Sequence, residues 1–211
     1  MRVPWVVGVS GASGTPYARA VLGGLLAAGR PVDLVVSRAA RLTLLDETGA
    51  SLRDAHWQED LAAWLGREPV DVRYHPAGDL AAGPASGSYR TRGMVVVPAS
   101  TAAVAGIALG LSKDLLQRAA DVTLKERRPL VVVPRETPYT RGTLQHLLSL
   151  HDSGATVLPA SPAFYAGARD VQQLVDFVAA KVLDAIGVEH DLLRRWTGRL
   201  GAAREAREEP E

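Results

Sequence analysis

A strand that leads directly into a helix through a glycine-rich turn constrains this sequence more than any other feature. It spans Val6–Tyr17, where a short apolar run is followed by the small residues Gly11–Gly14 and then at once by a helical pattern. Thr15 is expected as the helix N-cap and Pro16 at the first helical position, where its missing N–H costs nothing. The unpaired N–H groups of such a turn and the helix dipole favour an anion, most often a phosphate, although an ordinary tight turn is the alternative.

The composition of the chain excludes several classes of protein. Of its 211 residues, 47% are hydrophobic, enough for a sizeable core, and the net charge of +1 provides no field for nucleic acid or an anionic membrane. Cysteine is absent, which excludes disulfides, a thiolate nucleophile and a cysteine-based metal site. No apolar run approaches membrane length and the N-terminus is unlike a signal peptide, so a soluble cytoplasmic protein is expected. We expect one domain over residues 1–197 and a charged, disordered tail over residues 198–211.

Short apolar strands alternate with helical patterns along the rest of the chain. This order predicts an α/β fold, a doubly wound, Rossmann-like and mostly parallel sheet with helices on both faces. After the opening strand, the expected strands are Pro31–Val36, Pro69–Tyr74, Met94–Val97, Leu130–Val133 and Ala155–Leu158. The expected helices lie within Tyr17–Ala28, Ala39–Glu47, Ser51–Gly66, Thr101–Leu109, Asp114–Arg127, Thr140–Leu150 and Val171–Ile186.

Polar side chains follow the ends of the expected strands. The carboxyl ends of parallel strands meet at one edge of the sheet, and ligands of such sheets bind beyond that edge. Small hydroxyls, backbone N–H groups and an arginine there indicate a phosphate-bearing, largely planar ligand. The residues that we expect to share the edge are Ser13, Ser37, Ser100, Arg135 and Tyr165.

A nicotinamide dinucleotide is the first candidate for that ligand, and two features argue against it. The turn lacks the usual G-x-G-x-x-G spacing, because within Gly8–Gly14 the position of the second glycine is occupied by Ser10. The second strand ends in Ser37-Arg38, where a ribose-binding enzyme would carry an acid. Ser37-Arg38 could hold the extra phosphate of NADP, but the chain has no Tyr-x-x-x-Lys pair, so a reductase is the less favoured interpretation.

A series of short motifs runs along nearly the whole chain, from Val6 to Trp196. In order they are Gly11-Ala12-Ser13-Gly14, Glu47-Thr48, Pro84-Ala85-Ser86-Gly87-Ser88, Arg118-Ala119-Ala120-Asp121-Val122, Leu124-Lys125-Glu126-Arg127-Arg128-Pro129-Leu130, Pro134-Arg135-Glu136-Thr137-Pro138 and Pro162-Ala163-Phe164-Tyr165. Their order and spacing resemble those of the UbiX-type flavin prenyltransferases. The Lys-Glu-Arg-Arg-Pro-Leu and Arg-Glu-Thr-Pro blocks are the most specific part, whereas Gly-Ala-Ser-Gly alone would be weak.

The resemblance implies a reaction, a cofactor and partners. Such enzymes join a dimethylallyl group, taken from its monophosphate or diphosphate, to N5 and C6 of reduced FMN. The prenylated FMN then serves partner decarboxylases of the UbiD type. Members of the family assemble into homo-oligomers, often dodecamers, with active sites at subunit contacts. We expect the Pro84–Ser88 loop and the segment around Trp196 to reach a neighbouring subunit.

The resemblance also assigns roles to individual residues. The flavin-binding positions are Gly11, Ala12, Ser13, Ser37, Ser100, Thr101, Ala102 and Arg135. The positions that hold the prenyl phosphate are Lys125, Arg135, Tyr165 and Lys181. The catalytic positions are Ser13, Glu47 and Glu136, which are linked to proton handling, and Trp196, an aromatic near the allyl group whose ring attracts a developing cation.

Several of these residues have an ordinary structural interpretation as well, and the chain departs from the family pattern in places. Lys125 ends an expected helix, where a cation commonly complements the dipole. Glu47 also stands near a helix end, which is usually exposed. Lys181 replaces the more common arginine, so that a bidentate fork becomes a point charge. Asp114 stands where the family has an amide, and the sequence does not predict the effect of this change.

Two other functions stay open at this point. A sister flavoprotein that oxidatively decarboxylates cysteine-containing substrates typically has an active-site histidine and a Pro-Ala-Ser-Ala-Asn-Thr-like block. Here Pro98–Thr101 is shorter, and no histidine lies in the first turn or helix. A non-catalytic FMN carrier would have no use for the cationic residues assigned to the prenyl phosphate. The five histidines are scattered without metal-ligand spacing, so no metal is expected.

Overall fold

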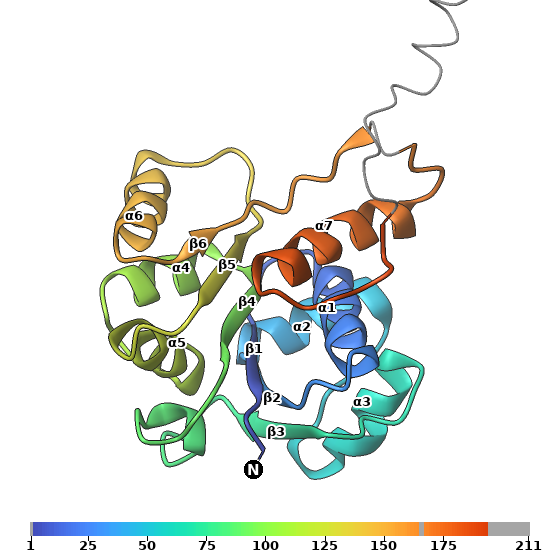
Figure 1. Cartoon of the computed structure of the whole chain (residues 1–211), viewed down its shortest axis with the longest axis horizontal. Coiled ribbons are helices and arrows are strands. Elements are labelled where there is room, and N and C mark those ends of the chain that lie inside the picture. Colours follow the sequence, from blue (N-terminus) through green and yellow to red (C-terminus); the bar gives the residue numbers. More distant parts are fainter. Residues whose placement is uncertain (1, 165–166, 194–211) are drawn as a thin grey trace, which may run out of the picture.

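A parallel sheet forms the centre of the computed structural model, which describes residues 2–164 and 167–193 (Figure 1). The sheet of these described ranges has six strands in the order β3-β2-β1-β4-β5-β6, and every neighbouring pair is parallel. The strands are β1 (Trp5–Val9), β2 (Val32–Val36), β3 (Val72–Pro76), β4 (Gly93–Ala99), β5 (Leu130–Pro134) and β6 (Thr156–Val157). The order reverses between β1 and β4, so the predicted doubly wound α/β fold is confirmed.

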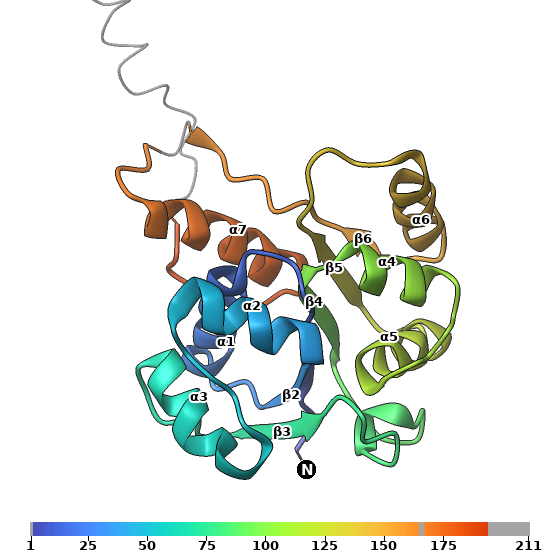
Figure 2. The same cartoon turned by 180° about the vertical axis from the view of Figure 1, so that it is seen from behind.

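Helices cover both faces of the sheet, as the two opposite views show (Figure 1, Figure 2). The first group, α1, α2, α3 and α7, packs on one face, and the second group, α4, α5 and α6, packs on the other. Their bounds are α1 (Thr15–Ala27), α2 (Arg38–Thr48), α3 (Trp57–Leu65), α4 (Thr101–Ala108), α5 (Leu115–Lys125), α6 (Arg141–Asp152) and α7 (Val171–Ala185). Short 3₁₀ turns stand at η1 (Asp54–His56) and η2 (Gly83–Ala85).

The central strands are buried along their whole length because helices cover both of their faces. Every residue of β1, β2 and β5 is buried. Neighbouring side chains of β1 belong to different halves of the core: Val6 packs with α4–α6, and Val7 packs with α1 and α7. This explains why the sequence shows continuous apolar runs rather than alternation. The buried strands hold the loops at their carboxyl ends in fixed relative positions.

The start of α1 differs from the sequence-based expectation. Gly14, not Thr15, is the N-cap, and it adopts a φ of 116° that glycine tolerates and other residues rarely adopt. Thr15 is the first residue of the helix, followed by Pro16. The Thr15 hydroxyl donates to the carboxylate of Glu47 instead of capping its own helix. The prediction failed because the partner of this hydroxyl lies in another helix.

Other expectations shift by a few residues or lie outside the described ranges. Strand β3 begins at Val72 rather than at Pro69, because Asp71 has a left-handed φ of 64° and the N–H of Val72 donates to Pro69 O in a turn. The predicted domain boundary at residue 197 and the charged tail over 198–211 lie outside the described residues. Among the helices that the structure describes, none has the length and apolar character needed to cross a membrane.

Candidate active site

The carboxyl edge of the sheet brings together four of the five polar residues that the sequence places after strand ends. Ser13 follows β1, Ser37 follows β2, Ser100 follows β4 and Arg135 follows β5. Because all of these strands are parallel, the residues lie along one edge. A direct contact joins two of the loops: Arg135 Nε donates to the carbonyl oxygen of Ser13 at 2.9 Å. The fifth residue, Tyr165, lies outside the described residues.

Ser37 and Ser100 are the N-caps of α2 and α4. The Ser37 hydroxyl oxygen accepts from Ala40 N–H at 3.1 Å, and that of Ser100 accepts from Ala103 N–H at 3.2 Å. As acceptors toward their own helices, both hydroxyls can still donate their proton to an anion. Two helix N-termini therefore present partial positive charge and O–H groups at the same edge. This donor set is suited to a phosphate group.

The residues expected to bind flavin in the turn after β1 and in the first turn of α4 have different surroundings. A side chain at Gly11 would overlap the Cβ of Ala39 in the first turn of α2, so glycine is required for the turn to pack there. Ala12 is buried, whereas Ser13 is exposed at the edge. In the first turn of α4, Thr101 is half-buried and Ala102 is exposed. The exposed members of this set lie where a ligand at the edge can reach them.

Sequence reasoning missed Ser10, which joins the two central loops of the edge. The side chain is only 2% exposed. Its hydroxyl donates to Pro98 O at 2.8 Å and accepts from Ser100 N–H at 2.7 Å. These partners lie far away in the sequence, so no local pattern could identify the role. Ser10 fixes the backbone of Ser100 relative to the turn that contains Ser13.

The anion at the N-terminus of α1 is a carboxylate of the chain itself. Glu47 lies in the last turn of α2, and its Oε1 accepts from Gly14 N–H at 2.8 Å. Its Oε2 accepts from Thr15 N–H at 2.9 Å and from the Thr15 hydroxyl at 2.6 Å. The sequence-based expectation of a phosphate at these N–H groups therefore needs correction. Glu47 occupies them, and a ligand phosphate must use other donors along the edge.

Glu47 is held in its charged form by these contacts. Partial burial alone would raise the pKa of the carboxyl group. Hydrogen bonds from the Ser13 and Thr15 hydroxyls and from the backbone N–H groups of Thr15 and Gly14 outweigh burial, and they lower the pKa below its ordinary value. At neutral pH Glu47 is a carboxylate, so it can accept a proton beside Ser13.

Glu136 lies at the same edge, directly after Arg135. Its side chain is exposed, and its Oε1 accepts from Thr137 N–H at 2.9 Å. Burial and the negative charge of Glu136 raise the pKa of Tyr139, while Arg135 opposes the shift. Burial also raises the pKa of Tyr17, again against the effect of Arg135. Arg135 therefore lies close enough to both phenols to influence their pKa values.

Lys125 and Lys181, which the resemblance assigns to the prenyl phosphate, make no contact with Arg135 among the interactions of the described residues. Lys125 is the last residue of α5 and comes shortly before the start of β5, which places it at the amino edge of the sheet. Its Nζ lies 2.6 Å from Glu126 Oε1. Lys181 is exposed on α7, with its Nζ 4.0 Å from Asp184 Oδ2. Trp196 lies outside the described residues.

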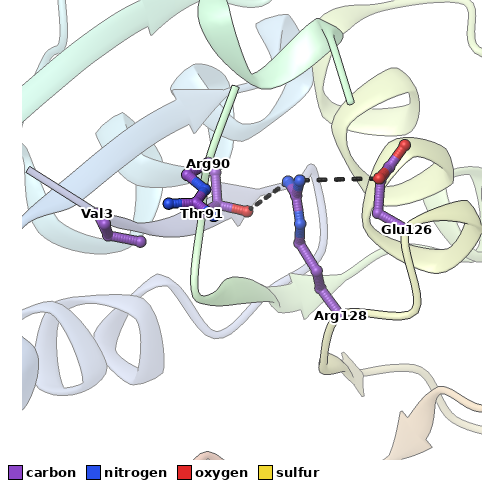
Figure 3. A pocket seen from close by; sticks show the side chains of 5 residues that line it. All are labelled: Val3, Arg90, Thr91, Glu126 and Arg128. Atoms are coloured by element: carbon purple, nitrogen blue, oxygen red, sulfur yellow. Dashed lines mark hydrogen bonds and ion pairs between the residues drawn. The ribbon is translucent and has the colours of Figure 1, made fainter. Parts of the chain in front are cut away.

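An open pocket of about 400 Å³ also lies at the amino edge (Figure 3). Its lining residues precede β1, β4 and β5 or end α5, and they are Val3, Arg90, Thr91, Glu126 and Arg128. Arg128 points between the other polar groups: its Nη1 donates to Thr91 Oγ1 at 3.2 Å, and Nη2 lies 4.0 Å from Glu126 Oε2. This pocket is separated by the length of the strands from the edge that carries Ser13 and Arg135.

Comparison with known proteins identifies the family. The sequence profile of the flavoprotein family matches residues 1–183. The flavin prenyltransferase UbiX of Streptomyces coelicolor is 68% identical, over 96% of this chain and 99% of that protein. The chain belongs to the UbiX flavoprotein family. The resemblance expected from the motifs is thereby confirmed.

Solved structures of UbiX proteins share the fold over nearly the whole chain. AnUbiX, crystallised with FMN and dimethylallyl pyrophosphate, superposes with a TM-score of 0.84 at 35% identity, over 94% of this chain and all of that one. A dodecameric, FMN-dependent UbiX-like decarboxylase from Escherichia coli O157:H7 gives 0.82 at 40% identity, over 93% of this chain and 100% of that one. The FMN-dependent cysteine decarboxylase SpaF gives 0.54 at 18% identity, which shows a shared fold alone.

Proposed function

We propose that this UbiX-family chain is a flavin prenyltransferase, which transfers a dimethylallyl group from dimethylallyl phosphate to N5 and C6 of reduced FMN. The observation that supports it most is the ionised Glu47 beside Ser13 and Arg135, at the ligand edge of a chain that is 68% identical to a flavin prenyltransferase. A base and a cation at one edge suit a reaction in which phosphate leaves and protons are displaced.

FMN binds along the carboxyl edge in this proposal. Its phosphate lies against the N-termini of α2 and α4, where Ser37 and Ser100 donate their hydroxyl protons. Arg135 and backbone groups near the two helix ends also contact the flavin in this proposal. The remaining flavin-binding residues are Gly11, Ala12, Ser13, Thr101 and Ala102. The reduced flavin supplies the nucleophilic ring atoms to which the prenyl group is joined.

The leaving phosphate needs positive charge. The allylic C–O bond breaks with its electron pair passing to the phosphate, and a guanidinium stabilises that charge by paired N–H donors. Arg135 is well placed for this role, because its Nε bond to Ser13 O fixes the plane of the guanidinium beside the turn. Lys125, Lys181 and Tyr165 are proposed as further phosphate contacts, and Trp196 as the aromatic group that faces the allyl cation.

Protons displaced from the flavin as the new C–N and C–C bonds form must be taken up by bases near the turn. Glu47 is the first candidate, because its lowered pKa makes it an acceptor at neutral pH. Ser13 is exposed and its side chain hydrogen-bonds Glu47, so its hydroxyl can relay a proton to the carboxylate. Glu136 is the second acceptor, at the exposed side of Arg135.

Lys125 acts across a subunit contact in this proposal. It lies at the opposite edge of its own sheet from Arg135, so it can approach a prenyl phosphate only in the site of another subunit. A homo-oligomer, as in the dodecameric relative, provides such a contact. The Pro84–Ser88 loop packs beside Lys125 and is expected to reach the same neighbour. The product passes to a UbiD-type decarboxylase, and the cytoplasmic location stays a prediction.

The experiment is an anaerobic incubation of the purified protein with reduced FMN and dimethylallyl phosphate. We expect release of phosphate and a flavin whose mass has increased by one dimethylallyl group. A parallel reaction with the diphosphate determines the preferred donor. Binding of FMN without phosphate release from either donor would identify a flavin carrier and reject the proposal.

A further inference from the structure

The hydroxyl of Thr15 has a role that the family motifs do not assign to it. We propose that Thr15 is a positioning residue for prenyl transfer, whose hydroxyl holds the Glu47 carboxylate in the orientation needed to accept a proton beside Ser13. The inference rests on the proposed function for the role of Glu47, but the contact itself can be tested without it.

The contact is buried and has short, regular geometry. Thr15 is 0% exposed, and its Oγ1 lies 2.6 Å from Glu47 Oε2. The same oxygen accepts from Thr15 N–H at 2.9 Å and from Gly14 N–H at 3.2 Å. Of these three donors, only Gly14 N–H also bonds Oε1, at 2.8 Å. The hydroxyl therefore saturates Oε2 and leaves Oε1 as the oxygen better able to take a proton.

The position of Glu47 in its own helix explains why it needs this support. It lies one residue before the end of α2, where the helix dipole disfavours a negative charge. The N-terminus of α1 compensates, but its backbone N–H groups are present whatever side chain stands at position 15. Side-chain donors come from Ser13 and Thr15, and of these two the Thr15 hydroxyl is the buried one, so its charge-assisted bond to Glu47 is strong.

The electrostatic surroundings agree with this assignment. Burial opposes ionisation of Glu47, and the groups that lower the pKa of its carboxyl are donors of residues 13–15. The other titratable groups at the turn are Arg135, whose Nε donates to Ser13 O, and Tyr17, whose ring packs against Gly14. Among the hydrogen bonds of the described residues, neither Arg135 nor Tyr17 donates to Glu47, so neither replaces the Thr15 hydroxyl as a donor to this carboxylate.

The test compares three variants of the full-length protein. Thr15→Val removes the hydroxyl and keeps the β-branched shape, whereas Thr15→Ser restores a hydroxyl. The matched control is Thr123→Val, because Thr123 is 2% exposed and its hydroxyl donates to Ala119 O at 2.7 Å in α5. Both valine substitutions delete one buried hydroxyl, but only one of them touches Glu47.

We expect Thr15→Val to lower kcat about tenfold, the factor equivalent to one hydrogen bond to a charged group. FMN affinity and the KM for dimethylallyl phosphate should stay within about twofold, because no ligand contact is removed. The acid limb of the kcat profile should move to higher pH, since the carboxylate loses a donor. Thr15→Ser should recover most of the activity. A kcat and pH profile equal to those of Thr123→Val would overturn the inference.

A second readout does not depend on catalysis. Melting temperatures of Thr15→Val, Glu47→Gln and the double variant form a cycle that measures the coupling between the two side chains. We expect the double variant to be more stable than the sum of the single losses implies, because each single variant breaks the same contact. Additive losses would contradict the contact. Wild-type protein that releases no phosphate would reject the proposed function and with it the role of Thr15 in prenyl transfer, while this cycle would still decide whether Thr15 and Glu47 are coupled.

Discussion

Arg135 and Ser13 are 122 residues apart in the sequence, yet the Nε of Arg135 donates to the carbonyl oxygen of Ser13 at 2.9 Å. The bond joins the loop after β5 to the loop after β1, across the intervening strand β4. It uses one edge of the guanidinium and leaves the remaining N–H groups for a ligand. A backbone oxygen thus orients the cation that we propose as the phosphate ligand.

Replacement of Arg135 by lysine tests this orientation. Arg135→Lys keeps the positive charge, but the lysine ammonium lacks the planar guanidinium that can donate to Ser13 O and form a bidentate contact with a phosphate at the same time. We expect the KM for dimethylallyl phosphate to rise about tenfold. Steady-state kinetics measure the effect, with Arg19→Lys, an exposed arginine of α1, as the control. An unchanged KM would remove Arg135 from the phosphate site.

Glu47→Gln separates binding from proton transfer. The amide has nearly the same shape but cannot take up a proton at neutral pH. We expect FMN affinity to change by less than a few-fold, while turnover falls by about a hundredfold or more, the range typical of a lost general base. FMN titration and single-turnover assays measure the two quantities. Full turnover in the variant would exclude Glu47 from the mechanism.

Ser10→Ala should weaken the edge without removing any proposed ligand contact. The substitution leaves Ser100 N–H without its side-chain acceptor and Pro98 O without the hydroxyl donor. We expect a loss of about 1–3 kcal/mol in the free energy of unfolding and weaker FMN binding. Chemical denaturation and FMN titration check this. Ser153→Ala, which removes an exposed hydroxyl at the end of α6, should leave both quantities unchanged.

Subunit mixing tests the role of Lys125 at a neighbouring site. Lys125→Ala and Arg135→Ala should each abolish most activity when purified separately. If an active site takes Arg135 from one subunit and Lys125 from another, mixed oligomers regain about a quarter of the sites by random assembly. Activity after co-refolding or co-expression measures this. No recovery in oligomers shown to be mixed would place both residues in the site of one subunit or exclude Lys125.

Asp33 should control the stability of the protein in acid. This carboxylate is 0% exposed; burial would raise its pKa, but His75 at 3.7 Å and hydrogen bonds from Arg2 and Tyr89 hold the pKa below its ordinary value. The stabilisation is therefore complete above about pH 4, the ordinary value for aspartate, and is lost as pH falls through the lowered value.

The Asp33→Asn variant tests this linkage. We expect it to lose about 3 kcal/mol at pH 7, since Arg2 then lacks its buried partner. The melting temperatures of variant and wild type should converge as the pH is lowered toward 3. Glu47, whose pKa is also lowered, makes the melting temperature of both proteins fall further as the pH is lowered. A constant difference between the two proteins at every pH would show that Asp33 does not titrate in this range.

The sequence predicted the fold well because strand burial and helix periodicity are local. Leu130–Pro134 is an apolar run and Val32–Val36 is apolar except for Asp33, so both fit a sheet covered on both faces, and Ser37 and Arg135 could be placed from the ends of those strands. The location of Glu47 relative to the turn could not be predicted, because it depends on how α2 packs beside α1. Ser10 was missed for the same reason, since its bonds join loops that are distant in sequence.

The Glu47 carboxylate at the start of α1 also limits how a nucleotide can lie on the protein. That helix end is already occupied, so we expect a ligand phosphate to bind instead at the N-termini of α2 and α4, capped by Ser37 and Ser100, and near the guanidinium of Arg135. The negative charge of Glu47 also disfavours a phosphate close to the end of β1. In this proposal, a side chain of the protein itself decides which helix end at the edge receives the phosphate, and so the direction in which the nucleotide lies.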